Sequence, residues 1–503
     1  MAEFVKKLQS RVHKTISSHP EQIAVQGMAA VSYGLAILVD EDSEECQNAR
    51  RRAKKVTENI KDVANYRRET LKFQEYLLKN QAEAEKEMHR MESPKWGSRL
   101  LALHKQMNTY DLTSGLSDFF SNLQSAEKHY FLKWMKFYLD RISQMHLAKL
   151  ERHSKEKQTS AASLGVEHFM RELGQVYEAK HLTIKEGKSG KNLSQLVDLP
   201  KITADLMLEG FTLELFDEDV SNTPLQWISD VLTELHNKLE GQSKIMVITV
   251  LGVQGTEKST LLNTMFGLQF AVNRGQYGRS ASVAFLKVTE DLADDLGCDA
   301  ILVIDTEGLT SPAMVKVEGA YLRNINNLAT LVAGLTDITI VNITRENTTE
   351  IKDVFQMVAC AFLERKMTGQ KPNCQFVHQN VNSGWAVIQK LLDRRQLLEQ
   401  LDGMIQAAAK AYKVKRNVRF SDIMDYDSGT NNWCIPSLWQ GVPPMAQINR
   451  GYSENVSELK KYLFKIIKSR SHKNPPKDIP QLIECFRNLD AIKMIKSASE
   501  VGS

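Results

Sequence analysis

The spacing of apolar residues changes about half-way along this chain. In the first 240 residues, polar side chains dominate and apolar ones recur at helical intervals, as at Val56, Ile60 and Val63. Positions i, i+4 and i+7 share one face of a helix. From residue 245, short and almost wholly apolar runs take over, and such runs are typical of strands buried on both faces of a parallel sheet. The pattern therefore predicts an α-helical region followed by an α/β domain.

The longest predicted helix extends from Ser43 to about Glu92, because this stretch contains neither Gly nor Pro and is followed by Pro94. Its apolar stripe is interrupted at Arg67 and Arg68. A helical arm packed on neighbouring helices is therefore favoured over a sustained coiled coil.

A second helix is predicted over residues 127–145, where aromatic side chains recur at helical spacing and are expected to face the core. These side chains are Phe131, Trp134, Phe137 and Tyr138. Polar stretches at 154–163 and 185–195 predict surface loops. The chain after them predicts a return to helix, with an amphipathic helix that opens at Thr223-Pro224 and ends near Gly241.

The second half alternates predicted strands with predicted helices, which indicates a doubly wound, mainly parallel α/β sheet with right-handed crossovers. The strands are expected at 245–251, 282–288, 300–305, 337–343 and 374–380, and intervening helices at 321–335 and 348–367. Closing helices are expected at 386–412, 452–470 and 479–497. The predicted organisation is thus a helical region 1–240, an α/β domain 241–450 and C-terminal helices 451–503.

Composition excludes several classes of protein. The chain has 503 residues, of which 42% are hydrophobic and 25% charged, an ordinary globular mixture. A formal net charge of +4 gives no general attraction to nucleic acid, so no nucleic-acid partner is expected. The six cysteines form no CxxC pair, which argues against a zinc site or a disulfide framework. No apolar run approaches the ~20 residues that span a bilayer, and we expect an intracellular protein in the cytoplasm, with the nucleus as an additional location.

A candidate phosphate-binding loop follows the first predicted strand. The string GVQGTEKST has the spacing of G-x-x-x-x-G-K-[ST], with Gly252, Lys258 and Ser259 in register and Glu257 in place of the second glycine. In the intact motif, backbone N–H groups surround the β-phosphate, the lysine neutralises phosphate oxygens and the hydroxyl holds Mg²⁺. The altered string alone is a weak indication of a nucleotide site.

A second motif strengthens this interpretation. The strand predicted at 300–305 runs into Asp305-Thr306-Glu307-Gly308, a D-x-x-G placed where G proteins hold Mg²⁺ and sense the γ-phosphate. The G-x-G-x-x-G of Rossmann enzymes is absent, as is the Asp-Glu pair of many ATPases. The order of strand, loop, helix, strand and D-x-x-G predicts a P-loop G domain.

Longer strings resemble the interferon-induced very large GTPases and the related up-regulator of cell proliferation. They lie at 259–272, 296–309, 374–381 and 433–446, with further similarity at 39–62 and 163–179. Members of that family are usually longer than this chain. The string DTEGL also looks like that of guanylate-binding proteins and atlastins, within the dynamin-like group. The resemblance implies binding of GTP or GDP with Mg²⁺, a link to interferon, and homodimer formation through the G domain.

The resemblance also implies a set of nucleotide-binding residues. They are Gly252, Gly255, Thr256, Lys258, Ser259, Thr260, Asp305, Gly308, His378, Gln379 and Asn380. Lys258 would contact the β- and γ-phosphates, and Ser259 and Asp305 would hold Mg²⁺. Gly308 would report the γ-phosphate. The string His378-Gln379-Asn380 stands where N/T-K-x-D follows the fifth strand of many G proteins, so guanine specificity is implied by the resemblance. Polar groups that merely satisfy one another at the strand end are the alternative.

Two positions depart from the family pattern. At Glu257, a carboxylate ~5 Å from a phosphate charge would cost about 3 kcal/mol at an effective dielectric of ~20, or about a hundredfold in affinity. In the alternative, Glu257 turns outward to solvent or interacts with a basic neighbour, which leaves the backbone cradle usable at reduced affinity. Gly278 stands where a switch threonine would complete the Mg²⁺ shell, when Arg279 is aligned with the family arginine.

Arg279 is the candidate catalytic residue, as an internal arginine finger, with Arg274 as the alternative. The resemblance implies a guanine-nucleotide-binding protein, and the two departures predict that its GTP hydrolysis is weak or absent. The alternative is a pseudo-GTPase scaffold that binds protein partners through its helical arms.

Overall fold

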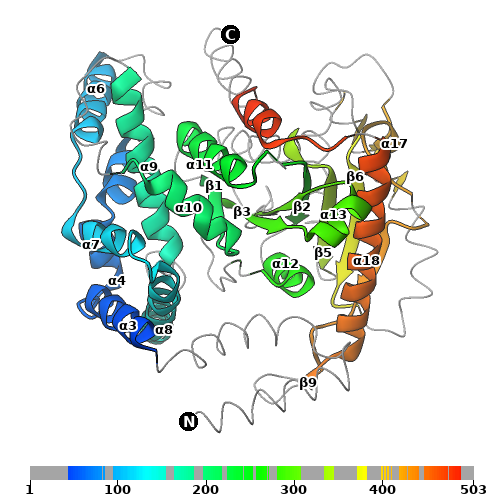
Figure 1. Cartoon of the computed structure of the whole chain (residues 1–503), viewed down its shortest axis with the longest axis horizontal. Coiled ribbons are helices and arrows are strands. Elements are labelled where there is room, and N and C mark those ends of the chain that lie inside the picture. The colour runs from blue at the N-terminus through cyan, green and yellow to red at the C-terminus, as the bar shows by residue number, and fades with distance from the viewer. Residues whose placement is uncertain are drawn as a thin grey trace.

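A computed structural model describes most of the helical region, the central sheet and part of the C-terminal helices. The described residues are 43–81, 83–84, 94–153, 164–185, 196–217, 224–241, 243–252, 256–268, 270, 280–306, 334–344, 371–381, 398–399, 401–403, 405–406, 409, 418–427, 429–440, 447–473 and 475–488. The helical region lies on one side of the sheet (Figure 1).

The centre of the second half is a seven-stranded sheet in the order β1-β3-β4-β2-β5-β6-β7. Its strands are β1 (Leu213–Asp217), β2 (Ile245–Gly252), β3 (Ser280–Lys287), β4 (Ala300–Thr306), β5 (Ile338–Thr344), β6 (Asn373–Gln379) and β7 (Asn432–Ile435). The strands from β4 through β2, β5 and β6 to β7 are parallel. β3 is antiparallel to both β4 and β1. The predicted mainly parallel α/β fold is confirmed, and so are its five predicted strands.

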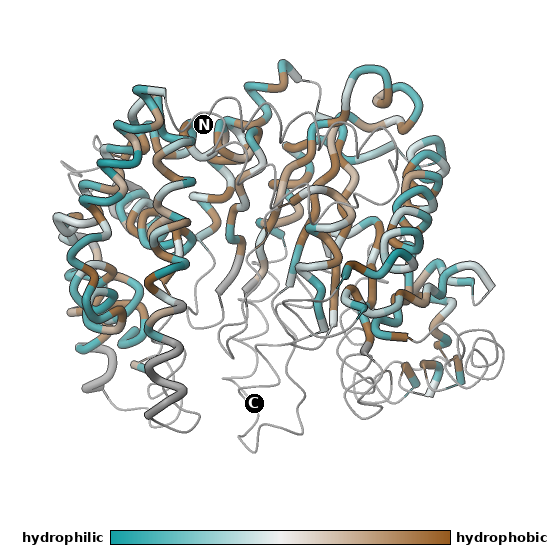
Figure 2. The backbone as a smooth tube through the Cα atoms, turned by 90° about the horizontal axis from the view of Figure 1, so that it is seen from below, coloured by the Kyte–Doolittle hydropathy of each residue, from teal (hydrophilic) through white to brown (hydrophobic). Residues whose placement is uncertain are grey.

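Alternate side chains of the strands pack on opposite faces of the sheet, as the two-residue repeat of a strand requires. Ile248 and Val250 of β2 pack with helices α12 (Lys258–Phe266) and α18 (Arg450–Lys473). Val247 and Leu251 join the core formed with α10 (Leu199–Leu208), α11 (Leu225–Lys238) and the helical region. All residues of β2 and β4 are buried. In Figure 2, the strands of the central sheet are coloured mainly as hydrophobic.

Strand β1 is a correction to the predicted return to helix after residue 195. Leu213 and Leu215 are buried and Glu214 between them is only half-buried, which is a strand alternation too short to stand out among helices. Leu213 lies opposite Val283 of β3, so the edge of the sheet is built from the predicted helical region. Strand β7 and the hairpin β8 (Trp439–Gln440) and β9 (Gln447–Ile448) were not predicted either.

The helical region contains more and shorter helices than predicted. They are α3 (Glu44–Thr57), α4 (Val63–Thr70), the π-helical η1 (Phe73–Leu78), α6 (Pro94–Asn108), α7 (Ser114–Leu123), α8 (Lys128–His153) and α9 (Val166–Lys185). Helix α8 confirms the helix predicted over 127–145, but Phe137 is 45% exposed instead of facing the core. Phe119 packs against Phe131 and Phe169 at centroid distances of 5.8 and 4.8 Å.

The single long helix predicted from Ser43 to Glu92 is wrong. Helix α3 ends at Thr57, and the Asp62 carboxylate then accepts a 3.0 Å hydrogen bond from the Asn65 N–H at the start of α4. An aspartate in this role caps a new helix. Leu71 ends helix α4, before the π-helical η1 begins at Phe73. High helix propensity concealed these breaks because they depend on capping and on burial against other helices.

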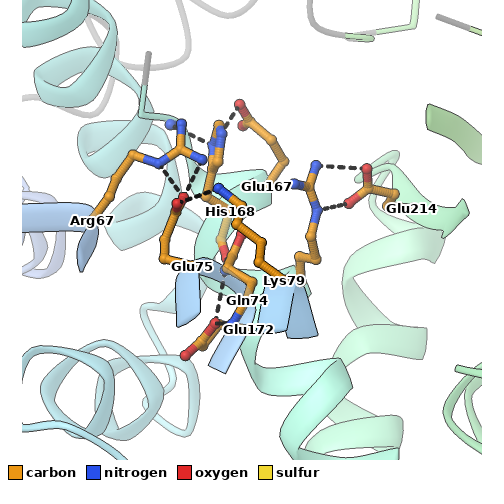
Figure 3. A network of polar contacts seen from close by, with 10 residues as sticks. Arg67, Gln74, Glu75, Lys79, Glu167, His168, Glu172 and Glu214 are labelled. Carbon is orange, nitrogen blue, oxygen red and sulfur yellow. Dashed lines mark hydrogen bonds and ion pairs between the residues drawn. The ribbon is translucent and has the colours of Figure 1, made fainter. Parts of the chain in front are cut away.

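A buried polar network joins η1 to α9 (Figure 3). Glu172 of α9 is fully buried and accepts hydrogen bonds from the backbone N–H groups of Phe73 (2.7 Å) and Gln74 (2.9 Å). The Gln74 side chain and the Tyr110 hydroxyl donate to it at 2.9 and 3.2 Å. Burial nevertheless raises the pKa of Glu172 to about 7, since the hydrogen bonds offset only part of the lost hydration.

Helix α9 also fastens the helical region to the sheet. Arg171 forms two hydrogen bonds, of 2.5 and 2.7 Å, with the Glu214 carboxylate of β1. One turn later, Gly174 lies against the indole of Trp227 in α11. The backbone N–H of Trp227 donates to the Glu178 carboxylate at 2.8 Å. The opposite face of the same helix carries Glu172, so α9 links the buried network to the edge of the sheet.

We expect Gly174→Ala to destabilise the protein by about 1–3 kcal/mol, the usual effect of overpacking a core. A Cβ at Gly174 would lie 2.7 Å from Nε1 of Trp227 and 2.9 Å from its Cδ1. Urea unfolding of the variant measures the change. Gly403→Ala is the matched control, because this helical glycine has open space around it. Alanine at this position should raise the free energy of unfolding by about 0.5–1 kcal/mol. Equal effects at both sites would contradict the close packing of α9 on α11.

The C-terminal helices are confirmed as far as they are described. Helix α18 covers the helix predicted at 452–470, the described residues between 398 and 409 are helical, and so are residues 479–488 of the third predicted helix. The helices predicted at 348–367 and over most of 321–335, and the predicted loop at 154–163, lie outside the described residues, as does nearly all of the loop predicted at 185–195. Within the described ranges, none of the helices combines the length and apolar character needed to cross a membrane.

Candidate functional site

The N-terminus of α12 lies where several parallel strands end. Strand β2 ends at Gly252, and α12 begins at Lys258. Asp305 and Asn342 lie near the carboxyl ends of the neighbouring strands β4 and β5, opposite Val250 and Gly252 of β2. Ligands of open α/β sheets bind at this edge, and a helix N-terminus there favours anions.

Gly252 allows the loop to leave the sheet in close contact with β5. Any other residue would place a Cβ 2.5 Å from the Asn342 carbonyl oxygen and 3.2 Å from Oγ1 of Thr256. Packing against β5 therefore requires glycine at this position of the motif, independently of any ligand.

Glu257 has the backbone conformation that its motif position reserves for glycine. Its φ and ψ are 57° and 30°, in the left-handed region, where a side chain is disfavoured. The side chain is exposed, yet protein atoms around the carboxyl group partly desolvate it and raise its pKa. The exposed side chain agrees with the alternative in which Glu257 turns outward.

Two amide side chains, from strands β5 and β6, form hydrogen bonds that hold the backbone of this turn. The Nδ2 group of Asn342 donates to the Thr256 carbonyl, and Nε2 of Gln379 donates to Oδ1 of Asn342 at 2.8 Å. The same Nε2 lies 3.4 Å from the Glu257 carbonyl. Gln379, predicted as a base-binding residue, thus contacts the loop. His378 is half-buried, and Asn380 has a φ of 60° at the end of β6.

Asp305 forms an acidic site beside the first turn of α12. Its side chain is 3% exposed, and burial raises its pKa although a hydrogen bond from Ser259 and the charge of Lys258 both lower it. In the part of the chain that the structure describes, no group donates a hydrogen bond to its buried Oδ1. An open carboxylate oxygen beside a serine hydroxyl is the donor set that Mg²⁺ accepts, so these residues fit the metal that the motif implies. Ser282 of β3 pairs with Asp305 across the strands.

The structure brings together most of the predicted residues that it describes. Those gathered around the turn are Gly252, Thr256, Lys258, Ser259, Thr260, Asp305 and Gln379. Gly255, Gly278, Arg279, Arg274 and Gly308 lie outside the described residues, so the predicted arginine finger and γ-phosphate contact stay predictions. Asn342 was missed. Its signal was a polar residue within the apolar run DITIVNI.

Sequence comparison assigns the chain to a family. The profile of the URGCP-like GTPase domain matches residues 72–453, and that of the up-regulator of cell proliferation-like domain matches residues 1–57. The chain belongs to the URGCP-like GTPase family. The family resemblance predicted from the motifs is thereby confirmed.

The chain is similar to longer proteins of the same family. The up-regulator of cell proliferation from Bos taurus is 37% identical over 515 residues, which cover 97% of this chain and 55% of that protein. The Homo sapiens protein is 36% identical, with 97% and 54% covered. Interferon-induced very large GTPase 1 from Homo sapiens is 30% identical over 524 residues, with 94% and 21% covered. The chain therefore spans about half the length of its up-regulator relatives.

Proposed function

We propose that this family member binds a guanine nucleotide with Mg²⁺ at the N-terminus of α12 and hydrolyses GTP slowly or not at all. The observation that carries the proposal is the meeting of Lys258, Ser259 and a buried Asp305 at the carboxyl edge of the sheet. Membership of a GTPase family supports guanine as the base.

Each residue has a distinct role in this proposal. The Leu261 N–H donates to the Glu257 carbonyl at 3.0 Å, which is the first hydrogen bond of helix α12. The backbone N–H groups before Leu261 lie in the first turn of the helix, where N–H groups bind anions, and they would donate to the phosphates. Lys258 would neutralise β- and γ-phosphate oxygens, and Ser259 and Asp305 would hold Mg²⁺. The metal, when bound, supplies positive charge to the phosphates.

Slow turnover follows from the two departures in the sequence. Glu257 brings negative charge to the rim of the phosphate site, and Gly278 lacks the hydroxyl that a switch threonine would offer to Mg²⁺.

Family likeness also supports a homodimer that forms through the G domain. Light scattering in the presence of a GTP analogue should then show a doubled mass.

A fluorescent GTP analogue titrated with and without Mg²⁺ tests the proposal. We expect saturable, Mg²⁺-dependent binding that GTP displaces better than ATP, and a Lys258→Ala variant that binds at least tenfold more weakly. Single-turnover release of phosphate should be slow or undetectable. If the intact protein gives no saturable signal, the scaffold function of the helical region replaces nucleotide binding. Rapid turnover would contradict the second half of the proposal.

A further inference from the structure

We propose that Asn342 and Gln379 are positioning residues of the phosphate-binding turn, which aim its backbone N–H groups at the nucleotide and compensate for the glutamate at its centre. The proposal rests on the proposed nucleotide binding. It assigns Gln379 a role under the loop in place of the base contact predicted for it.

The two amides form a short relay across neighbouring strands. Gln379 of β6 donates to Oδ1 of Asn342 in β5 at 2.8 Å, and the Nδ2 group of Asn342 donates to the Thr256 carbonyl. Asn342 is 2% exposed and Gln379 is 1% exposed. An amide has one acceptor end and one donor end, so the bond from Gln379 fixes the orientation in which Asn342 presents its donor to the loop.

Because the peptide unit is planar, a hydrogen bond that fixes the direction of a carbonyl group also fixes the direction of the next N–H group. The carbonyl of one residue and the N–H of the next belong to one planar trans peptide unit and point in opposite directions. Asn342 holds the Thr256 carbonyl toward β5, so the Glu257 N–H points away from β5. The Glu257 carbonyl is held by the Leu261 N–H at 3.0 Å and by Gln379 at 3.4 Å, which turns the Lys258 N–H away likewise. Successive N–H groups oriented in this way form an anion-binding concavity.

The relay has a particular purpose in this chain because residue 257 is not glycine. Glycine adopts a positive φ freely, whereas Glu257 at φ 57° is strained. A strained turn persists only when its surroundings hold it in place. Two buried amide hydrogen bonds supply such a hold, and their net effect on stability is of the same order as the strain. The relay should therefore matter less once residue 257 is glycine.

The test measures the affinity of a fluorescent GTP analogue and of inorganic tripolyphosphate, which has no base. Asn342→Leu removes the donor to Thr256 and is expected to weaken both ligands by about tenfold, the effect of one lost hydrogen bond of about 1.4 kcal/mol. Gln379→Met should weaken both ligands by a smaller factor, with an unchanged preference for GTP over ATP. In the Glu257→Gly background, the effect of Asn342→Leu should fall below about threefold.

A matched control separates positioning from general loss of stability. Gln375 lies on the same strand as Gln379, is equally buried, and bonds Asn373 at 2.6 Å and Trp433 at 2.9 Å, away from the loop. Gln375→Met should lower stability and leave both affinities unchanged. In the nucleotide-free protein, hydrogen exchange at Lys258–Leu261 should be faster in Asn342→Leu than in Gln375→Met.

Several outcomes would overturn the inference. If Asn342→Leu and Gln379→Met both bind the two ligands as tightly as the wild-type protein, the inference is wrong, although nucleotide binding itself is supported. Weaker GTP binding with unchanged tripolyphosphate binding would make Gln379 a base-reading residue. If the wild-type protein binds neither probe, the proposed function fails and the inference with it. If Asn342→Leu does not fold, Gln379→Met carries the same comparison alone.

Discussion

Replacing Glu257 with glycine is expected to tighten the binding of Mg²⁺-GTP by ten- to a hundredfold. A carboxylate ~5 Å from a phosphate at an effective dielectric of ~20 costs about 3 kcal/mol, and an exposed side chain that turns away costs less. The left-handed backbone at φ 57° adds strain of about 1–2 kcal/mol, which glycine removes. Titration of both proteins with a fluorescent GTP analogue measures the change.

Glu257→Gln separates the two contributions. It removes the charge and keeps a side chain in the left-handed conformation, so its affinity should lie between those of the wild-type protein and Glu257→Gly. The glycine variant should also unfold at a higher urea concentration, whereas the glutamine variant should not. Unchanged affinity in both variants would show that Glu257 does not affect the phosphate site.

Glu172→Gln is expected to remove a pH dependence of about 2–3 kcal/mol from the stability of the protein between pH 5 and pH 8. Burial raises the pKa of Glu172 to about 7 from an ordinary value of 4.5. The folded state therefore keeps a proton that the unfolded state loses. The stabilisation is fully present below the unfolded pKa and is lost as the pH rises to the folded pKa, and 2.5 pKa units correspond to about 3 kcal/mol.

Urea unfolding at several pH values between 5 and 8 measures this effect as the difference between wild-type and variant proteins. The groups that face the Glu172 carboxylate are the Gln74 side chain, two backbone N–H groups and the Tyr110 hydroxyl. A parallel dependence in both proteins would show that Glu172 is ionised throughout this range.

Glu75 provides a control of opposite sign in the same network. Burial alone would raise its pKa, but Arg67 and Lys79 lower it overall. Its contribution to stability should be present above the unfolded pKa and be lost as the pH falls below it. Glu75→Gln should therefore change the acid side of the stability curve and leave the range between pH 6 and pH 8 as in the wild-type protein.

The strands were predictable where local pattern and burial coincide. The runs that form β2 and β4 are almost wholly apolar because both faces of these strands are covered. Strand β1 has only five residues, and its position depends on pairing with β3, which lies far along the chain. The breaks between α3, α4 and η1 depend likewise on the Asp62 cap and on Glu172, which is distant in sequence.

The site was predictable to the extent that it follows from a contiguous motif. Lys258 and Ser259 follow the loop directly, and Asp305 ends an apolar strand, so motif and strand end sufficed to identify them. Asn342 could not be identified in this way, because its contact with the loop arises from the pairing of β5 with β2 at Gly252. Gln379 was identified by position, but its bonds to Asn342 and Glu257 depend on three elements meeting in space.

The most direct measurement is hydrogen–deuterium exchange of the wild-type protein and Lys258→Ala, with and without Mg²⁺ and a non-hydrolysable GTP analogue. Peptides that contain residues 256–262 should exchange more slowly when the analogue is present, because phosphate oxygens would cover the N–H groups that precede Leu261. The lysine variant should show little of this protection at the same analogue concentration. Saturable binding that protects another part of the chain and leaves residues 256–262 unchanged would contradict a phosphate site at the start of α12.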